Sequence, residues 1–67
     1  MNEKMITFNF RFCYENDKAI KVVNPITNKE YYIAKKVIDT YVDNLFRRGD
    51  IVPITIPFCV AKQKHLV

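Results

Sequence analysis

Residues 5 to 14 read Met-Ile-Thr-Phe-Asn-Phe-Arg-Phe-Cys-Tyr, and this stretch decides the fold. Every second position carries a large apolar or aromatic side chain, and smaller or polar residues stand between them. Because successive side chains of a β-strand point to opposite faces, the alternation predicts a strand with one buried face. The core-facing positions would be Ile6, Phe8, Phe10, Phe12 and Tyr14.

The chain has 67 residues, of which 49% are hydrophobic and 13% aromatic. A domain of this size buries only about 60% of its unfolded surface, so its stability is marginal. The apolar content and the single glycine nevertheless argue against disorder. We therefore expect residues 1–67 to form one small domain. Residues 61–67 are polar and basic until Leu66, which predicts a frayed tail.

A hairpin and a short third strand are expected next. Residues 15–18 contain Asn and Asp, which favour turns, and Ala19–Val23 then has the composition of a return strand. Thr27 and Glu30 have the spacing of a capping box, which would start a helix between them. We favour the alternative in which Tyr31–Ile33 is a strand, because tyrosine and isoleucine prefer strands.

A long helix is predicted for Ala34–Arg48. Apolar residues recur there at the three-and-four spacing of one helix face. On the polar face, the pairs Lys35–Asp39 and Asp43–Arg47 have the i,i+4 spacing of intrahelical ion pairs. The apolar positions are Ala34, Val37, Ile38, Tyr41, Val42, Leu45 and Phe46.

The last strand is predicted for Ile51–Val60, after Gly49, which suits a left-handed helix cap. Alternate residues are again apolar. Pro53 and Pro57 remove two hydrogen-bond donors from the same side of this strand, so it should lie at an edge of the sheet. Its core-facing positions would be Val52, Ile54, Ile56, Phe58 and Val60.

These elements predict an α+β fold of two layers, in the order β-β-(β)-α-β. An antiparallel hairpin and a C-terminal edge strand would form the sheet, and the helix would pack on its aromatic face. In this arrangement Phe8, Phe10 and Phe12 would contact Val37, Tyr41 and Leu45.

The sequence contains no recognisable catalytic or metal-binding pattern. Cys13, Cys59 and His65 do not have the spacing of a zinc site. Asp39 and Asp43 would lie on an exposed face beside basic residues, an environment that does not raise a carboxyl pKa for acid catalysis. We therefore expect a protein that is not an enzyme and has no cofactor, metal or small-molecule substrate.

The N-terminus lacks the basic and apolar regions of a signal peptide, and no apolar run approaches the roughly 20 residues of a membrane helix. We therefore expect a cytoplasmic protein without membrane association. In that reducing setting Cys13 and Cys59 would be thiols. Both are predicted on the non-core faces of their strands, where a disulfide or an intermolecular bridge could form in air.

The aromatic strand has two interpretations. Rings on an open sheet can stack with the bases of single-stranded nucleic acid. The predicted helix, however, needs a large apolar surface to cover, so we favour a core role for the rings. The opposite face would be polar and mildly basic, with Thr7, Asn9, Arg11, Cys13, Lys21 and Thr55.

Two functions are consistent with these features. The first is a small protein-interaction module, such as a regulator, an inhibitor or an accessory subunit, which self-associates in its simplest form. Aromatic and apolar residues anchor such interfaces. The contact candidates are Tyr31, Tyr32, Phe46 and Ile51.

The alternative is a nucleic-acid-binding module, suggested by the net charge of +4. One continuous basic stripe in the folded protein would favour this alternative, whereas scattered charges beside an apolar patch would favour a protein partner. The candidate phosphate contacts are Arg11, Lys21, Lys35, Lys36, Arg47, Arg48, Lys62 and Lys64.

Overall fold

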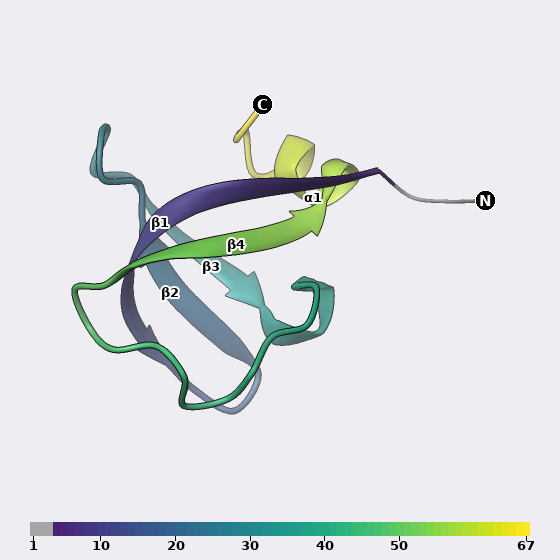
Figure 1. Cartoon of the computed structure of the whole chain (residues 1–67). Coiled ribbons are helices and arrows are strands. Elements are labelled where there is room, and N and C mark those ends of the chain that lie inside the picture. The colour runs from purple at the N-terminus through teal and green to yellow at the C-terminus, as the bar shows by residue number, and fades with distance from the viewer. Residues whose placement is uncertain (1–3) are drawn as a thin grey trace.

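The computed structural model describes residues 4–67, which form a small α+β domain with a four-stranded antiparallel sheet (Figure 1). The strand order is β3-β2-β1-β4. A 3₁₀ turn follows β3, and one short helix follows β4. The elements are β1 (Met5–Glu15), β2 (Ala19–Val23), β3 (Glu30–Ala34), η1 (Lys35–Val37), β4 (Ile51–Pro57) and α1 (Phe58–Gln63).

The strand β1 belongs to both halves of the sheet. Residues 5–11 pair with β4, and residues 11–15 pair with β2. In Figure 1 the β1–β4 ribbon therefore crosses over the β2–β3 ribbon, and the sheet folds back on itself. Arg11 lies at the junction, aligned with Ile51 on one side and with Val23 on the other.

The hydrophobic core lies between these two halves of the sheet. Phe10 is 1% exposed, and the half-buried Phe8 stacks on it with ring centroids 5.6 Å apart. The core role of the aromatic strand is thereby confirmed. The buried residues are Phe10, Phe12, Ile20, Val22, Ile33, Ile38, Val52, Ile54, Ile56 and Ala61.

The prediction of a helix at Ala34–Arg48 is wrong. Beyond η1, residues 38–50 form a loop, in which Thr40 and Asn44 have φ angles of 51° and 61°. These left-handed conformations are incompatible with a right-handed helix. Residues 38–44 are Ile, Asp, Thr, Tyr, Val, Asp and Asn, all of which are mediocre helix formers. The apolar spacing instead lets single side chains of the loop reach the core.

The packing partners predicted for the aromatic strand are correct only in part. Val37 and Tyr41 pack against the core as half-buried residues. Leu45 does not, because it is 60% exposed. Phe46 takes its place, with its ring centroid 5.7 Å from that of Phe12.

The C-terminal residues cover the core, so the prediction of a frayed tail at 61–67 is wrong. Ala61 in α1 is completely buried, and Leu66 packs against the core. The N–H of Leu66 donates to the carbonyl of Ala61 at 2.9 Å, and His65 has a φ of 58°. This is the pattern of a Schellman cap, which ends the helix and folds the chain back. The predicted last strand therefore ends three residues early, and α1 contains Phe58, Cys59 and Val60.

The prediction that the last strand lies at an edge is confirmed, because β4 pairs only with β1 among the strands described. The carbonyl of Thr55 accepts the N–H of Asp39 at 2.8 Å on the outer side of β4. Backbone groups of every second residue point to the same side of a strand, so the backbone nitrogens of Pro53 and Pro57 also point to the unpaired edge of β4. Another strand could not form a full ladder on this side.

A bulge at Cys13 reverses the alternation at the end of β1. Phe12 is aligned with Val22 and Tyr14 with Lys21, so Cys13 is the extra residue. A bulge shifts which face the following side chains occupy. The prediction that Tyr14 faces the core is therefore wrong, and its side chain is 46% exposed.

Candidate functional site

Two exposed tyrosines lie on the outer face of the sheet, opposite the core. Tyr14 of β1 is aligned with Lys21 of β2, and Lys21 is aligned with Tyr32 of β3. Aligned residues of neighbouring strands share one face of a sheet. Tyr32 is 54% exposed. We refer to Tyr14, Lys21, Tyr32 and the adjoining Glu30 as the tyrosine cluster.

Lys21 connects the members of the tyrosine cluster. Its Nζ lies 5.8 Å from the ring centroids of both Tyr14 and Tyr32, and 3.2 Å from Oε1 of Glu30. Its hydrogen bond to Glu30 raises the pKa of Lys21, against the opposing effect of desolvation. Hydrogen bonding to the Tyr32 side chain, followed by desolvation, raises the pKa of Tyr14. At neutral pH Tyr14 therefore presents a neutral phenol, and Glu30 balances the charge of Lys21.

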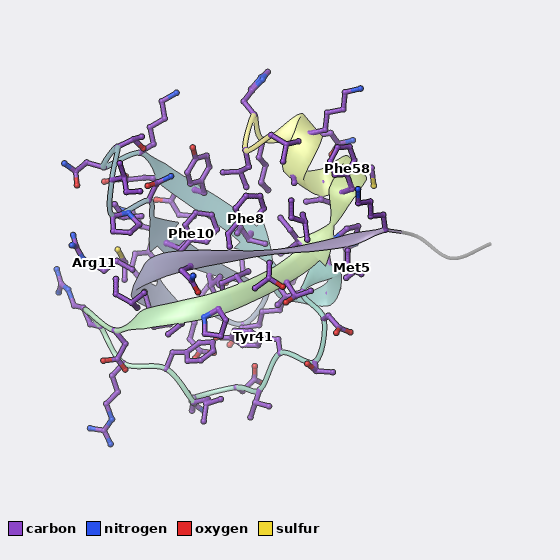
Figure 2. The ribbon with its side chains drawn as sticks, turned by 45° about the horizontal axis from the view of Figure 1, so that its top comes forward. Met5, Phe8, Phe10, Arg11, Tyr41 and Phe58 are labelled. Carbon is purple, nitrogen blue, oxygen red and sulfur yellow. The ribbon has the colours of Figure 1, made fainter. Side chains whose placement is uncertain are left out.

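Arg11 lies on the same outer face, and Arg47 and Arg48 belong to a turn whose backbone is hydrogen-bonded to the next residue of β1, Phe12. Arg11 is flanked by Ile51, which is 55% exposed, and by the half-buried Val23. Val23 and Lys21 stand two residues apart on β2, so this corner adjoins the tyrosine cluster. Figure 2 shows Arg11 at the end of the molecule away from Phe58 of α1. We refer to Arg11, Arg47 and Arg48 as the arginine corner.

The turn at residues 47–50 brings Arg47 and Arg48 to this corner. The N–H of Asp50 donates to the carbonyl of Arg47 at 3.0 Å, and Gly49, the third residue of the turn, has a φ of 92°. This φ favours glycine at the third turn position. Gly49 therefore forms a turn and does not cap a helix as predicted. Its N–H donates to the carbonyl of Phe12 at 2.8 Å, which fixes the turn beside β1.

The three arginines have no carboxylate partner among the residues that the structure describes. All three are exposed. Asp50 belongs to the same turn as Arg47 and Arg48, and its Oδ2 accepts the backbone N–H of Arg47 at 3.2 Å. The arginine corner is therefore a local concentration of positive charge.

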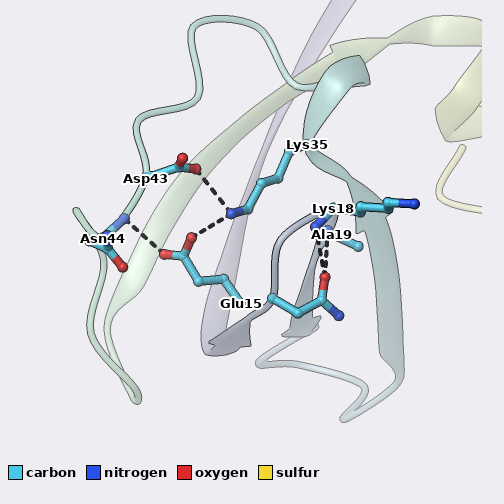
Figure 3. Close-up of polar contacts among 7 residues, drawn as sticks. Glu15, Lys18, Ala19, Lys35, Asp43 and Asn44 are labelled. Atoms are coloured by element: carbon cyan, nitrogen blue, oxygen red, sulfur yellow. Dashed lines mark hydrogen bonds and ion pairs between the residues drawn. The ribbon is translucent and has the colours of Figure 1, made fainter.

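A third polar group fastens the loop at residues 38–50 to the sheet (Figure 3). The Nζ of Lys35 lies 2.7 Å from Oε2 of Glu15 and 3.0 Å from Oδ1 of Asp43, and Oε1 of Glu15 accepts the N–H of Asn44 at 3.0 Å. The i,i+4 pairs predicted from the sequence are not formed. We refer to Glu15, Lys35, Asp43 and Asn44 as the loop tether.

The loop tether shifts the pKa values of Glu15 and Lys35, and Tyr41 beside it also has a shifted pKa. The hydrogen bond from Lys35 lowers the pKa of Glu15 against desolvation, and the bond to Glu15, followed by that to Asp43, raises the pKa of Lys35. Burial, followed by the charge of Glu15, raises the pKa of Tyr41 to about 12. The Tyr41 hydroxyl makes no hydrogen bond of good geometry within residues 4–67.

Replacing Glu15 with glutamine should lower the melting temperature at neutral pH. The pKa of the Glu15 carboxyl is lower in the folded state than its ordinary value of 4.5, so the ionised carboxyl stabilises the protein at pH values above 4.5. This stabilisation is lost as the pH falls through the folded-state pKa. The difference between wild type and Glu15→Gln should therefore shrink in acid. Thermal melts from neutral to acidic pH measure it, with the exposed Asp17→Asn as control. An equal difference at every pH would contradict the role of the Glu15 charge.

The protein-contact candidates chosen from the sequence separate into two groups. Tyr32 and Ile51 are exposed on the outer face. Tyr31 and Phe46 are half-buried and pack their rings on Phe10 and Phe12, with centroids 5.7 Å apart in both cases. These two residues belong to the core. Tyr14 was predicted to face the core and was not a contact candidate, because a bulge leaves no signal in a pattern of alternation.

The nucleic-acid candidates do not converge on one site. Lys21 and Lys35 are engaged by carboxylates, and Nζ of Lys64 donates to the carbonyl of Tyr32 at 2.6 Å. Lys36 lies in η1 and Lys62 in α1. The remaining candidates are the three residues of the arginine corner.

The predicted polar face of β1 is confirmed for Thr7, Asn9 and Arg11, which are exposed. The hydroxyls of Thr7 and Thr55 lie 2.7 Å apart across β1 and β4. Cys13 lies in the β1 bulge and Cys59 in α1, and the two are not disulfide-bonded to each other.

No group of three or more His, Cys, Asp or Glu side chains within residues 4–67 is arranged to hold a metal ion. The same residues contain no helix of sufficient length and apolarity to cross a membrane. No protein-family model, curated protein or solved structure matches the chain. Its function is therefore inferred from its own surface.

Proposed function

We propose that this chain is a small non-enzymatic protein-interaction module, and that the outer face of its sheet is the contact surface. The observation that carries this proposal is the tyrosine cluster. It places two half-exposed aromatic rings on the two sides of Lys21 on one face of the sheet. Tyrosine is enriched among the residues that dominate interface energies. An aromatic pair with a charged rim is typical of protein contact surfaces.

The tyrosine cluster is ordered before any partner binds. Its members come from three neighbouring strands, and Lys21 contacts both rings and Glu30. Side chains that already occupy few rotamers in the free protein lose less conformational entropy on binding. Tyrosine adds to this advantage because it has only two side-chain torsions.

The alternative, a nucleic-acid-binding module, has the net charge and the arginine corner in its favour. Two observations count against it. Lys21, Lys35 and Lys64 are already engaged within the protein. The ammonium of Lys21 also lies against both exposed tyrosine rings, where bases would have to stack.

Comparative capture from an extract of the source organism tests the proposal. Nuclease-treated extract is passed over immobilised wild type, over Tyr14→Ser/Tyr32→Ser, and over Val42→Ser/Leu45→Ser. The last variant is the matched control, because Val42 and Leu45 are 55% and 60% exposed in the loop away from the tyrosine cluster. Bound proteins are then quantified by mass spectrometry.

We expect a protein that wild type and the loop variant retain equally and that the tyrosine variant loses. Loss of two aromatic anchors at about 2 kcal/mol or more each corresponds to well over a tenfold weakening. Retention of the same proteins by all three forms would reject the outer face as the contact surface. Light scattering on the purified protein identifies the case in which the partner is a second copy.

A further inference from the structure

We propose that the partner docks an acidic segment of its chain on the arginine corner, beside the tyrosine cluster. This inference rests on the proposed function and names the chemistry of the partner. The corner contains three exposed arginines whose side chains have no carboxylate partner within residues 4–67. Guanidinium groups bind carboxylates through two parallel hydrogen bonds, which gives both energy and orientation.

The surroundings of Arg11 suit a peptide. Its neighbours on the outer face are Ile51, which is 55% exposed, and the half-buried Val23. The arginine stem can lie along these apolar side chains while the guanidinium remains in water. A segment with an apolar residue next to its acids would contact both kinds of group. A phosphate backbone would leave Ile51 without a partner.

The acids near this surface compensate the arginines only in part, because one carboxylate, that of Asp50, lies in the same turn as two of the three guanidinium groups. Asp50 directs its carboxylate to the backbone N–H of Arg47, and Glu30 is paired with Lys21. The remaining positive charge is therefore free to attract an acidic partner over about a Debye length. Such complementarity steers association and selects among partners.

Three exposed arginines share this corner, whereas other exposed basic residues lie elsewhere, and this distribution favours an acidic segment over nucleic acid. Lys62 of α1 lies at the other end of the molecule from Arg11, as the positions of α1 and Arg11 show (Figures 1 and 2). A nucleic-acid strand would need cations along a longer track. Docking through side chains is also consistent with Pro53 and Pro57 on the outer edge of β4, where an added strand could not pair fully.

Fluorescence anisotropy with short labelled probes tests the inference. The probes are a peptide rich in aspartate, glutamate and leucine, the same peptide with asparagine and glutamine in place of its acids, and a mixed-sequence DNA oligonucleotide. The test variant is Arg47→Ser/Arg48→Ser. The matched control is Lys36→Ser/Lys62→Ser, which removes the same charge from exposed positions elsewhere. Circular dichroism verifies that both variants are folded.

We expect wild type to bind the acidic peptide, the amide peptide to bind at least tenfold more weakly, and added salt to weaken the complex. The arginine variant should lose about tenfold or more in affinity, because charge-assisted hydrogen bonds contribute about 1.5–3 kcal/mol each. The lysine variant should bind as wild type does.

Three outcomes would overturn the inference: equal binding of both peptides, equal losses in both variants, or tighter binding of the oligonucleotide. The capture experiment distinguishes a failure of this inference from a failure of the proposed function. If Tyr14→Ser/Tyr32→Ser still loses its captured protein while the acidic peptide does not bind, only the chemistry of the partner is wrong. If that variant loses nothing, the interaction surface itself is wrong.

Discussion

Replacing Phe10 with alanine should leave the protein largely unfolded at room temperature. The Phe10 side chain is 1% exposed, and its ring lies 5.6 Å from that of Phe8 and 5.7 Å from that of Tyr31. Removing a buried phenylalanine costs about 3–5 kcal/mol, through lost transfer free energy and the cavity that remains. A domain of this size has little more stability than that.

Urea and thermal denaturation followed by circular dichroism measure this effect. Tyr32→Ala is the matched control, because it removes a ring of similar size from a side chain that is 54% exposed. We expect the control to retain a cooperative transition near that of wild type. Similar transitions for both variants would mean that the aromatic face of β1 is not the centre of the core.

The strands could be predicted because each carries its own signal. Strict alternation identified β1 and the core face of β4, and the β-branched Ala19–Val23 matched β2 in both bounds. The preference of tyrosine and isoleucine for strands decided correctly in favour of β3 at residues 30–34. Two outward prolines were enough to place β4 at an edge. All of these signals are local in sequence.

The prediction of a helix was wrong because the spacing of apolar residues indicates which side chains contact the core and does not determine the backbone conformation. Ile38, Tyr41 and Phe46 do reach the core, but from a loop that the loop tether holds in place. The poor helix propensity of residues 38–44 was visible in the sequence and carries more weight than their spacing. Lys35 pairs with Glu15, twenty positions earlier, and with Asp43, eight positions later, and spacing rules within a helix could not reveal either pair.

The outer face could be predicted only in part. Arg11 and Lys21 were placed there by alternation, and Tyr32 and Ile51 were chosen as contact residues. Tyr14 joined them because of the bulge at Cys13, which inserts one residue opposite β2. The approach of Arg47 and Arg48 to Arg11 depends on hydrogen bonds between the 47–50 turn and Phe12. Neither feature has a signature in a single sequence.

The role of α1 leads to the second large prediction, that Ala61→Asp prevents stable folding. Ala61 is completely buried against the core, and no basic side chain is among the buried residues around it. A carboxylate there would be desolvated without a partner, at a cost of several kcal/mol. A tail that frayed would tolerate the same substitution.

Gln63→Asp provides the matched control, because it introduces the same charge at an exposed position of the same helix. Both substitutions place aspartate in α1 and change the net charge equally, and the helix propensities of alanine and glutamine differ by only a few tenths of a kcal/mol. A loss of stability in Ala61→Asp that exceeds this small difference therefore reports the burial of position 61. Urea denaturation should show a cooperative transition for Gln63→Asp and little or none for Ala61→Asp. Equal transitions would mean that α1 does not close the core.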